Sequence, residues 1–471
     1  MSSDPIQPPV TRFRRIKATL WIMAGFLFLI VFVIPMSVRV YRLWGIPDVG
    51  HPFDVEEFGT VELPDDENAR IDYDAAIAAL VPLPKVADRD TWKELDVALS
   101  EGWSSATPVI RQWLDDNRPA LERWRRGTEK PDFLFVQPKT LNFSTSTETL
   151  QEYRPLDRLA ALESSRLLAE GQHNEAWIWS RAILRFSRHV GQHGYLIERL
   201  TGASLYQAGV NSTLALAHDP SVTEELLRQM LQESTAIAEK TVPQSVTIKC
   251  EYLSINNTMN DPKYLLDDDT DTLERLKIRM GAYFVAEFRL VQLLSQHYVA
   301  NILDQIDLPM KDRQPRIGSV EVFQRDPAKT YPPDVLPPET IEERAKKSWT
   351  FRAMMISAYR QLDYACLNEL TRQRTLEICL ASQIYQKMNG AYPKDLDDLV
   401  RAGILDEIPI DPYSKTGERM HYRVTADGVL AWSIGYNGID DGGEIDKSNR
   451  KAGGLLDVGL RLGDSVEAQK P

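Results

Sequence analysis

The chain has 471 residues, of which 43% are hydrophobic and 26% are charged. This composition supports a folded protein with a substantial core and excludes wholesale disorder. Asp and Glu outnumber Lys and Arg by 68 to 55, which gives a formal net charge of −13. Nucleic-acid backbones are bound by concentrated positive charge, so we expect no general affinity for nucleic acid.

The first predicted element is a membrane-spanning helix at residues 18–38, an uncharged run of 21 residues. A helix of this length reaches about 31 Å, enough to cross the hydrocarbon core of a bilayer. Four basic residues precede the run (Arg12, Arg14, Arg15 and Lys17), and two follow it closely (Arg39 and Arg42). This bias favours a cytoplasmic tail at 1–17, with the bulk of the chain outside the cytoplasm.

A cleaved signal peptide is the alternative interpretation of this run. The apolar region of a signal peptide usually has about 7–15 residues and ends in a small-x-small cleavage site. The run here is longer, and the residues from Pro35 to Tyr41 contain no such site. We therefore predict an uncleaved, single-pass anchor.

After a linker at 39–67, residues 68–303 are predicted to form a helical domain. Short helices are expected at 68–80 and 91–99, and a longer one at 107–126. Apolar residues then recur at helical spacing in three further stretches, 156–167, 176–190 and 196–214. This pattern predicts a mainly α fold built as an antiparallel helical bundle.

The helix ends within this domain carry recognisable signals. Gly171 and Gly191 fall between the periodic stretches, where helices commonly end. Asp271 followed by Glu274 is a capping-box pattern, which predicts a helix from there to about Leu303. The turn that begins at Gly171 is loosely similar to the turn of a tetratricopeptide repeat. No 34-residue self-similarity accompanies it, so we favour a non-repeating bundle.

A proline-rich segment at 304–340 marks the clearest internal boundary, with seven prolines between Pro309 and Pro338. Such density is incompatible with a regular helix and predicts a linker. Residues 341–389 contain neither Gly nor Pro and are predicted to be helical. The pattern is consistent with one long helix or with a helix pair.

A small C-terminal module is expected at 390–446, because Asn389-Gly390 ends the preceding helix. Residues 394–400 are predicted to form a short amphipathic helix. The stretches 419–424 and 429–434 alternate in polarity and bracket Asp427-Gly428, which predicts a β-hairpin. The remaining residues, 447–471, are expected to be a flexible tail.

An acidic, glycine-rich loop follows the hairpin. Calcium prefers six to eight oxygen ligands on flexible loops, and this loop offers several. The alternative is a solvated acidic turn that needs no metal. The predicted ligands are Asn437, Asp440, Asp441, Glu444 and Asp446.

The order of motifs in 385–446 resembles the globular end of the major pseudopilin of type II secretion systems. The matching motifs are Tyr392-Pro393, Asp411-Pro412-Tyr413 and the stretch from Ser433 to Gly443. The resemblance implies an α+β head whose loop closes on calcium. In that family an aspartate follows S-x-G-x, whereas Asn437 stands here.

The N-terminus departs from the pseudopilin pattern, since it lacks the G-F-x-x-x-E processing motif. The whole chain looks more like a membrane-anchored protein of planctomycete-type bacteria that carries this head as a C-terminal addition. The resemblance implies a structural or protein-interaction role, with protein partners and a link to secretion machinery.

No catalytic motif stands out in the sequence. His189 and His193 have the spacing of two ligands on one helix face, but the glutamate of a zinc peptidase does not follow His189. There is no G-x-S-x-G elbow, phosphate-binding loop or C-x-x-C pair. We therefore favour a non-enzymatic role, with an envelope hydrolase whose site lies in the helical domain as the alternative.

Overall fold

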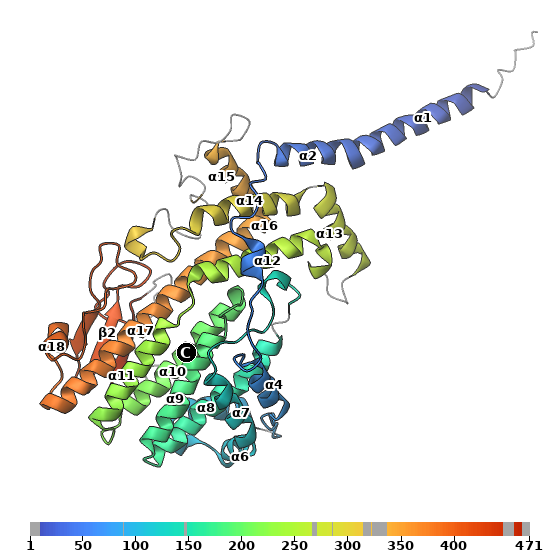
Figure 1. Cartoon of the computed structure of the whole chain (residues 1–471). Helices are drawn as coiled ribbons and strands as arrows, with labels where there is room; N and C mark the ends of the chain where they lie inside the picture. The colour runs from blue at the N-terminus through green and yellow to red at the C-terminus, as the bar shows by residue number, and fades with distance from the viewer. Residues whose placement is uncertain are drawn as a thin grey trace, which may run out of the picture.

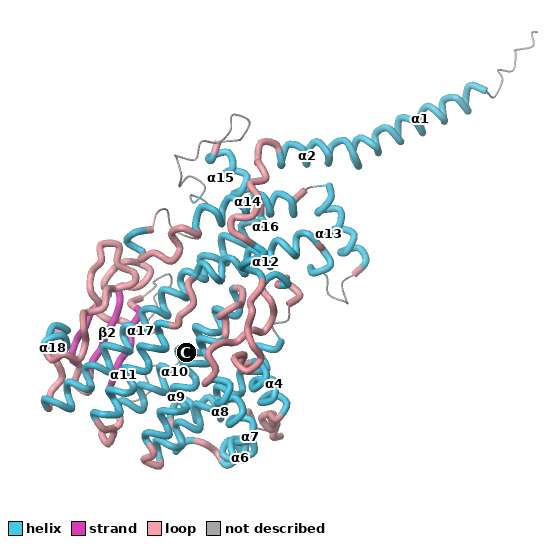
Figure 2. Tube along the Cα trace, viewed as in Figure 1, coloured by secondary structure: helices cyan, strands magenta, loops and turns pink. Residues whose placement is uncertain are grey.

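The structure is a computed structural model that describes residues 10–87, 89–145, 148–265, 271–284, 286–313, 322, 337–445 and 456–463. In this part of the chain the fold is mainly helical, with a single three-stranded sheet near the C-terminus. Figure 1 shows an elongated body from which the N-terminal helix projects, and Figure 2 shows how little of the described chain is strand. The predicted mainly α class is confirmed.

The N-terminal helix is continuous through α1 (Val10–Phe28), a π-helical turn (Leu29–Val33) and α2 (Ile34–Leu43). Its stretch Ile16–Leu43 has 28 residues and is long and apolar enough to cross a membrane. None of its most apolar window is buried against the rest of the described chain. The helix therefore extends beyond both ends of the predicted run 18–38.

The larger hydrophobic core lies among helices that pack side by side (Figure 1). It contains large buried side chains such as Trp113, Trp124 and Trp177. The central helices are α8 (Glu148–Ala169), α9 (His173–His189), α10 (Leu196–His218), α11 (Glu224–Glu239) and α17 (Ala358–Asn389). They are joined on one side by α4 (Arg70–Ala78), α5 (Thr91–Glu101), α6 (Pro108–Asp116) and α7 (Arg118–Thr128).

A second core lies nearer to the N-terminal helix. Its helices are α12 (Gln244–Asn260), α14 (Glu287–Ile302), α15 (Pro338–Lys347) and α16 (Trp349–Phe351). Two long helices contribute to both cores. The first turn of α10 supplies Leu196 to the second core, while Leu205 belongs to the first; α17 likewise supplies Cys366 to the second and Leu376 to the first. The two cores are thus tied together by continuous helices.

Two predicted helices are interrupted in the structure. The helix expected at 107–126 is the pair α6 and α7, which break at Asn117. The side-chain amide of Asn117 donates to the carbonyl oxygens of Val81 (3.0 Å) and Trp113 (2.8 Å). Pro119, in the first turn of α7, has no N–H with which to continue the hydrogen bonding of α6. The prediction of a single helix from Asp271 to about Leu303 is also wrong.

That stretch is instead two helices, α13 (Thr272–Phe284) and α14. Ala286 has φ 54°, a left-handed conformation that no helix accommodates in its interior. A different kind of break separates α15 from the next helix. There the side chain of Ser348 accepts the N–H of Phe351 at 3.1 Å, so that 341–389 is interrupted near its start.

The two predicted linkers differ in what the structure describes. Residues 39–67 contain the end of α2 and the short helix α3 (Val55–Gly59), and Ile46 is buried in the second core. Most of the proline-rich segment 304–340 lies outside the described residues, although Val322 is described and buried.

The C-terminal module contains the short helix α18 (Leu396–Arg401) and the antiparallel sheet β1 (His421–Val424), β2 (Val429–Ser433) and β3 (Val458–Leu462). The hairpin lies where alternation predicted it, with Val424 opposite Val429. The turn requires glycine, because a Cβ on Gly428 would lie 1.9 Å from the carbonyl oxygen of Leu462.

β3 corrects the prediction that residues 447–471 are a flexible tail. It pairs with β2 along its whole length and packs against α17, and Leu460 and Leu462 are buried. With a neighbour on each side, the five residues of β2 are all buried. The sheet therefore depends on a strand that the sequence analysis did not predict.

Candidate functional site

The end of α2, where the N-terminal helix meets the body, is held by charged groups from distant parts of the chain. Arg42 forms an ion pair with Glu287, the first residue of α14. The hydroxyl of Ser348 donates to the other carboxylate oxygen of Glu287 at 2.6 Å. Arg344 of α15 donates to the carbonyl oxygens of Arg42 (2.7 Å) and Trp44 (2.8 Å). These carbonyls lie where a helix runs out of internal donors, so Arg344 caps α2.

The chain immediately after α2 is fixed to the body as well. Asp48 pairs with Arg289 at 2.5 Å, and the ring Nε2 of His297 hydrogen bonds to the carbonyl oxygen of Pro47 at 3.2 Å. The hydrogen bond from Arg289, with one from the backbone N–H of Gly50, holds the pKa of Asp48 below its ordinary value. Tyr41 and Trp44, in contrast, keep about 70% of their surface exposed. We call the set Arg42, Glu287, Arg344 and Ser348 the helix root.

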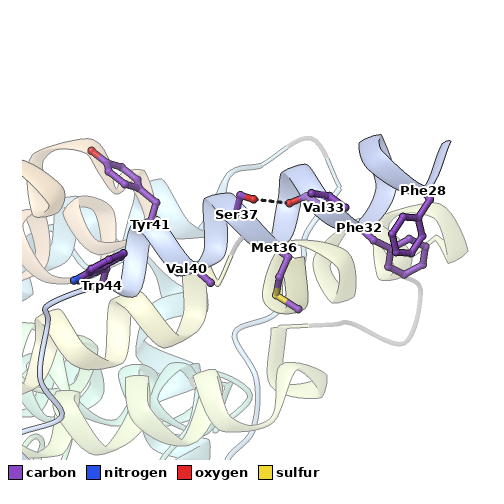
Figure 3. A pocket seen from close by; sticks show the side chains of 8 residues that line it. All are labelled: Phe28, Phe32, Val33, Met36, Ser37, Val40, Tyr41 and Trp44. Atoms are coloured by element: carbon purple, nitrogen blue, oxygen red, sulfur yellow. Dashed lines mark hydrogen bonds between the residues drawn. The ribbon is translucent and has the colours of Figure 1, made fainter. Parts of the chain in front are cut away.

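An apolar face runs along the helix above the root. Figure 3 shows Phe28, Phe32, Met36 and Val40 projecting from it, and they line a hollow together with Val33, Ser37, Tyr41 and Trp44. The hydroxyl of Ser37 is satisfied within the helix, since it donates to the carbonyl oxygen of Val33 at 2.8 Å, and the other polar side-chain groups, on Tyr41 and Trp44, lie at the root end of the face. This face is therefore suited to an apolar environment.

The acidic loop lies at the other end of the molecule, and its side chains pair locally. Asp440 accepts hydrogen bonds from the indole N–H of Trp432 (3.0 Å) and the backbone N–H of Gly442 (2.9 Å). The amide of Asn437 donates to Asp441 at 2.9 Å. Glu444 is half-buried at the end of the loop, and the predicted ligand Asp446 lies outside the described residues.

Asp457, which the sequence analysis missed, closes the loop from the start of β3. Its two carboxylate oxygens accept the backbone N–H groups of Asp441 (3.2 Å) and Gly443 (2.8 Å). Burial, with a smaller contribution from the negative charges of Asp440 and Asp441, raises the pKa of Asp457 to about 6, although the two backbone N–H groups oppose the shift. Nothing near residue 457 in the sequence carries a local signal for this role.

These residues meet only part of what a calcium site needs. Their oxygen donors are chemically suited to calcium. Among the described residues, however, no three acidic, histidine or cysteine side chains converge as metal ligands. A cation bound by Asp440 or Asp441 would compete with the N–H donors that these carboxylates already accept. Calcium binding by the loop stays a prediction.

His189 and His193 do not share a helix face, because α9 ends at His189. His189 is buried; its Nδ1 accepts the hydroxyl of Tyr73 at 2.6 Å, and its Nε2 donates to the carbonyl oxygen of Lys130 at 3.1 Å. Burial lowers the pKa of His189 to about 4, which keeps the ring neutral. His193 instead contacts Asp132 at 3.0 Å. The two histidines therefore serve separate contacts.

A buried cluster of opposite charges joins α9, α10 and α17. Glu369 is fully buried and lies between Arg188 and Arg199, with Arg199 at 2.6 Å. Arg188 also donates to the hydroxyl of Thr241 at 2.5 Å and stacks over the ring of Tyr206. Burial alone would raise the pKa of Glu369, but the two arginines outweigh it and lower the pKa. We call Arg188, Arg199 and Glu369 the Arg–Glu–Arg cluster.

Two buried carboxyl groups meet at the start of α10. Glu198 accepts the backbone N–H of Tyr195 at 2.7 Å, and Glu251 of α12 accepts that of Leu196 at 3.1 Å. Burial raises the pKa of each to about 7, and Glu251 further raises that of Glu198. The sequence contained one signal for this arrangement, the spacing from Tyr195 to Glu198, which the sequence analysis did not recognise because tyrosine is not a usual capping residue.

Comparison with known proteins adds no relative: no protein family, curated protein or solved structure matches this chain.

Proposed function

We propose that this chain is a single-pass membrane-anchored protein of a bacterial cell envelope. In this proposal the helical body is a scaffold that presents the C-terminal module to protein partners, in a structural or interaction role linked to secretion machinery. The observation that carries it is the helix root. An exposed apolar helix of spanning length is attached to the body by Arg42–Glu287 and by the capping side chain of Arg344.

The attachment supports an anchor rather than a removable leader. A cleaved leader has no need of contacts with the mature protein, whereas here α14 and α15 both bind the end of α2. The basic residues before the span favour a cytoplasmic N-terminus, which puts the body outside the cytoplasm.

Calcium-dependent ordering of the acidic loop is part of the same proposal. The raised pKa of Asp457 reflects its burial and the nearby charges of Asp440 and Asp441. A divalent cation would relieve that repulsion and add rigidity to the face of the module that we expect partners to meet.

Protease accessibility tests the topology. Spheroplasts expressing the full chain with a C-terminal epitope are treated with protease, and a cytoplasmic protein serves as the control for intact membranes. We expect loss of the epitope and of the body while the control survives. Protection of the body until detergent is added would place it in the cytoplasm and overturn the orientation.

A further inference from the structure

The helix α13 lies beside α2, on the side of the body from which the N-terminal helix projects (Figures 1 and 2). It contacts both α2 and α14, so its position is tied to the helix root. Any membrane crossed by Ile16–Leu43 would therefore have its surface close to α13.

The outer face of α13 is apolar. Leu273, Leu276 and Met280 expose 56%, 53% and 44% of their surface, whereas Ile278 is half-buried. The three exposed residues are spaced by three and four positions, which places them in one stripe along the helix. A helix on the surface of a soluble domain normally shows the reverse pattern, with its apolar stripe against the core.

Positive charge accompanies this stripe. Within α13 there are three basic residues, Arg275, Lys277 and Arg279, and one acidic residue, Glu274. The excess is confined to the helix itself, since four aspartates directly precede it in the sequence, at 267–269 and 271. An apolar stripe flanked by Lys and Arg is the pattern of helices that lie in the surface of an anionic bilayer.

Exposed aromatic side chains stand near the same place. Trp349 follows Ser348 of the helix root and exposes 79% of its surface, and Tyr41 and Trp44 flank the end of α2. Tryptophan and tyrosine concentrate at the boundary between hydrocarbon and water, because their rings are apolar and their polar atoms need water.

We propose that α13 is a second membrane contact, which lies in the interface of the membrane crossed by α1–α2 and binds anionic phospholipid headgroups. The proposal rests on the proposed anchor. Continuity with the span favours a lipid surface. Charge favours it as well, because symmetric pairing with a second copy would set the basic side chains of two α13 helices against each other, whereas anionic headgroups complement them.

Site-specific labelling of the full chain tests this contact. Met280→Cys and Met388→Cys are a matched pair, since the two methionines are 44% and 45% exposed and Met388 lies at the far end of α17. Phe26→Cys reports on the span. The three native cysteines are buried, and unsubstituted protein measures their background labelling. Each variant carries an environment-sensitive fluorophore in nanodiscs that hold one copy of the protein.

In nanodiscs with 30% phosphatidylglycerol we expect the probes at 280 and 26 to shift to the blue and to be quenched several-fold by spin-labelled lipid, while the probe at 388 stays in water. Pure phosphatidylcholine should reduce the quenching at 280 and not at 26. Leu273→Glu with Leu276→Glu should abolish it at 280 alone.

The outcomes separate the two proposals. If the probe at 26 is quenched and the probe at 280 behaves like that at 388, the anchor stands and the second contact is overturned. If the probe at 26 stays in water, the anchor itself fails. Shielding at 280 that appears only with two copies per nanodisc would assign the stripe to a contact between copies and would also overturn the proposal.

Discussion

The Arg–Glu–Arg cluster and the acidic loop both bring charged side chains together, but the cluster joins opposite charges from distant segments and the loop gathers like charges from positions 440–457. In the body, Glu369 is fully buried and its charge is matched by Arg188 and Arg199. In the C-terminal module, Asp440, Asp441 and Asp457 carry like charges in a loop that is partly open to solvent. Burial requires neutralised charge, whereas the exposed loop tolerates repulsion. We therefore expect substitutions in the body to cost more.

The largest effect is expected for Glu369→Ala. It leaves two buried arginines without their carboxylate and should lower the free energy of unfolding by about 3–5 kcal/mol. Urea denaturation of the full chain in detergent measures the change. Glu122→Ala removes an exposed pair with Arg125 and should cost less than about 0.5 kcal/mol. Equal losses of unfolding free energy in the two variants would contradict the claim that the buried charge matters more than the exposed one.

A smaller effect, of opposite sign, is expected for Glu251→Gln. The raised pKa means that Glu251 stays protonated in the folded protein up to about pH 7. It loses its proton in the unfolded chain near its ordinary pKa of 4.5. Stability is therefore lost as pH rises from about 4.5 to 7. Glutamine has no such cost and still accepts the N–H of Leu196, so it should add about 1–3 kcal/mol at pH 8.

The comparison for Glu251→Gln is a pair of denaturation curves at pH 5 and pH 8. The gain should be small at pH 5, where wild type is already protonated in the folded state. Glu62→Gln, at an exposed position outside any helix or strand, should change neither curve. A gain that is the same at both pH values would show that ionisation is not its cause.

Asp457→Ala should cost about 1 kcal/mol, because two hydrogen bonds are lost while an unfavourable charge is also removed. Limited proteolysis should show faster cleavage near Gly442, with the helical body intact. Asp457→Asn keeps one acceptor and should lie between wild type and alanine. Unchanged cleavage in both variants would mean that Asp457 does not close the loop.

The smallest effect is expected from calcium. At about twice its dissociation constant, calcium should stabilise the module by about 0.6 kcal/mol. Asp441→Ala should abolish this shift in the melting temperature of the full chain, and chelator should reproduce the variant in wild type. Identical melting and proteolysis of wild type in calcium and in chelator would mean that the loop is a solvated turn.

Local patterns predicted much of this fold. The hairpin followed from the alternation around Asp427-Gly428. Pro119 is the sequence signal for the break between α6 and α7. The apolar periodicity continues on both sides of it, so the sequence analysis predicted one helix. Ala286 carries no breaking signal, so the end of α13 was not predictable from local sequence.

The functional contacts were harder to predict, because they join residues far apart in the chain. Arg42 and Glu287 are 245 residues apart, and Arg188 and Glu369 are 181 apart. Asp457 follows the predicted loop and directly precedes β3, a strand that is too short to recognise by periodicity. These pairs form only when α2 packs on α14 and when α9 and α17 are brought together in the folded body.

The length of α17 has a mechanical consequence. Its 32 residues form a rod about 48 Å long that begins near the helix root and ends beside the sheet (Figure 1). A rigid helix of this length fixes the distance between the C-terminal module and the helix root, whereas a flexible linker would let that distance vary. A force applied to the module would therefore be transmitted along α17 towards Arg344 and Arg42, and from there to the N-terminal helix.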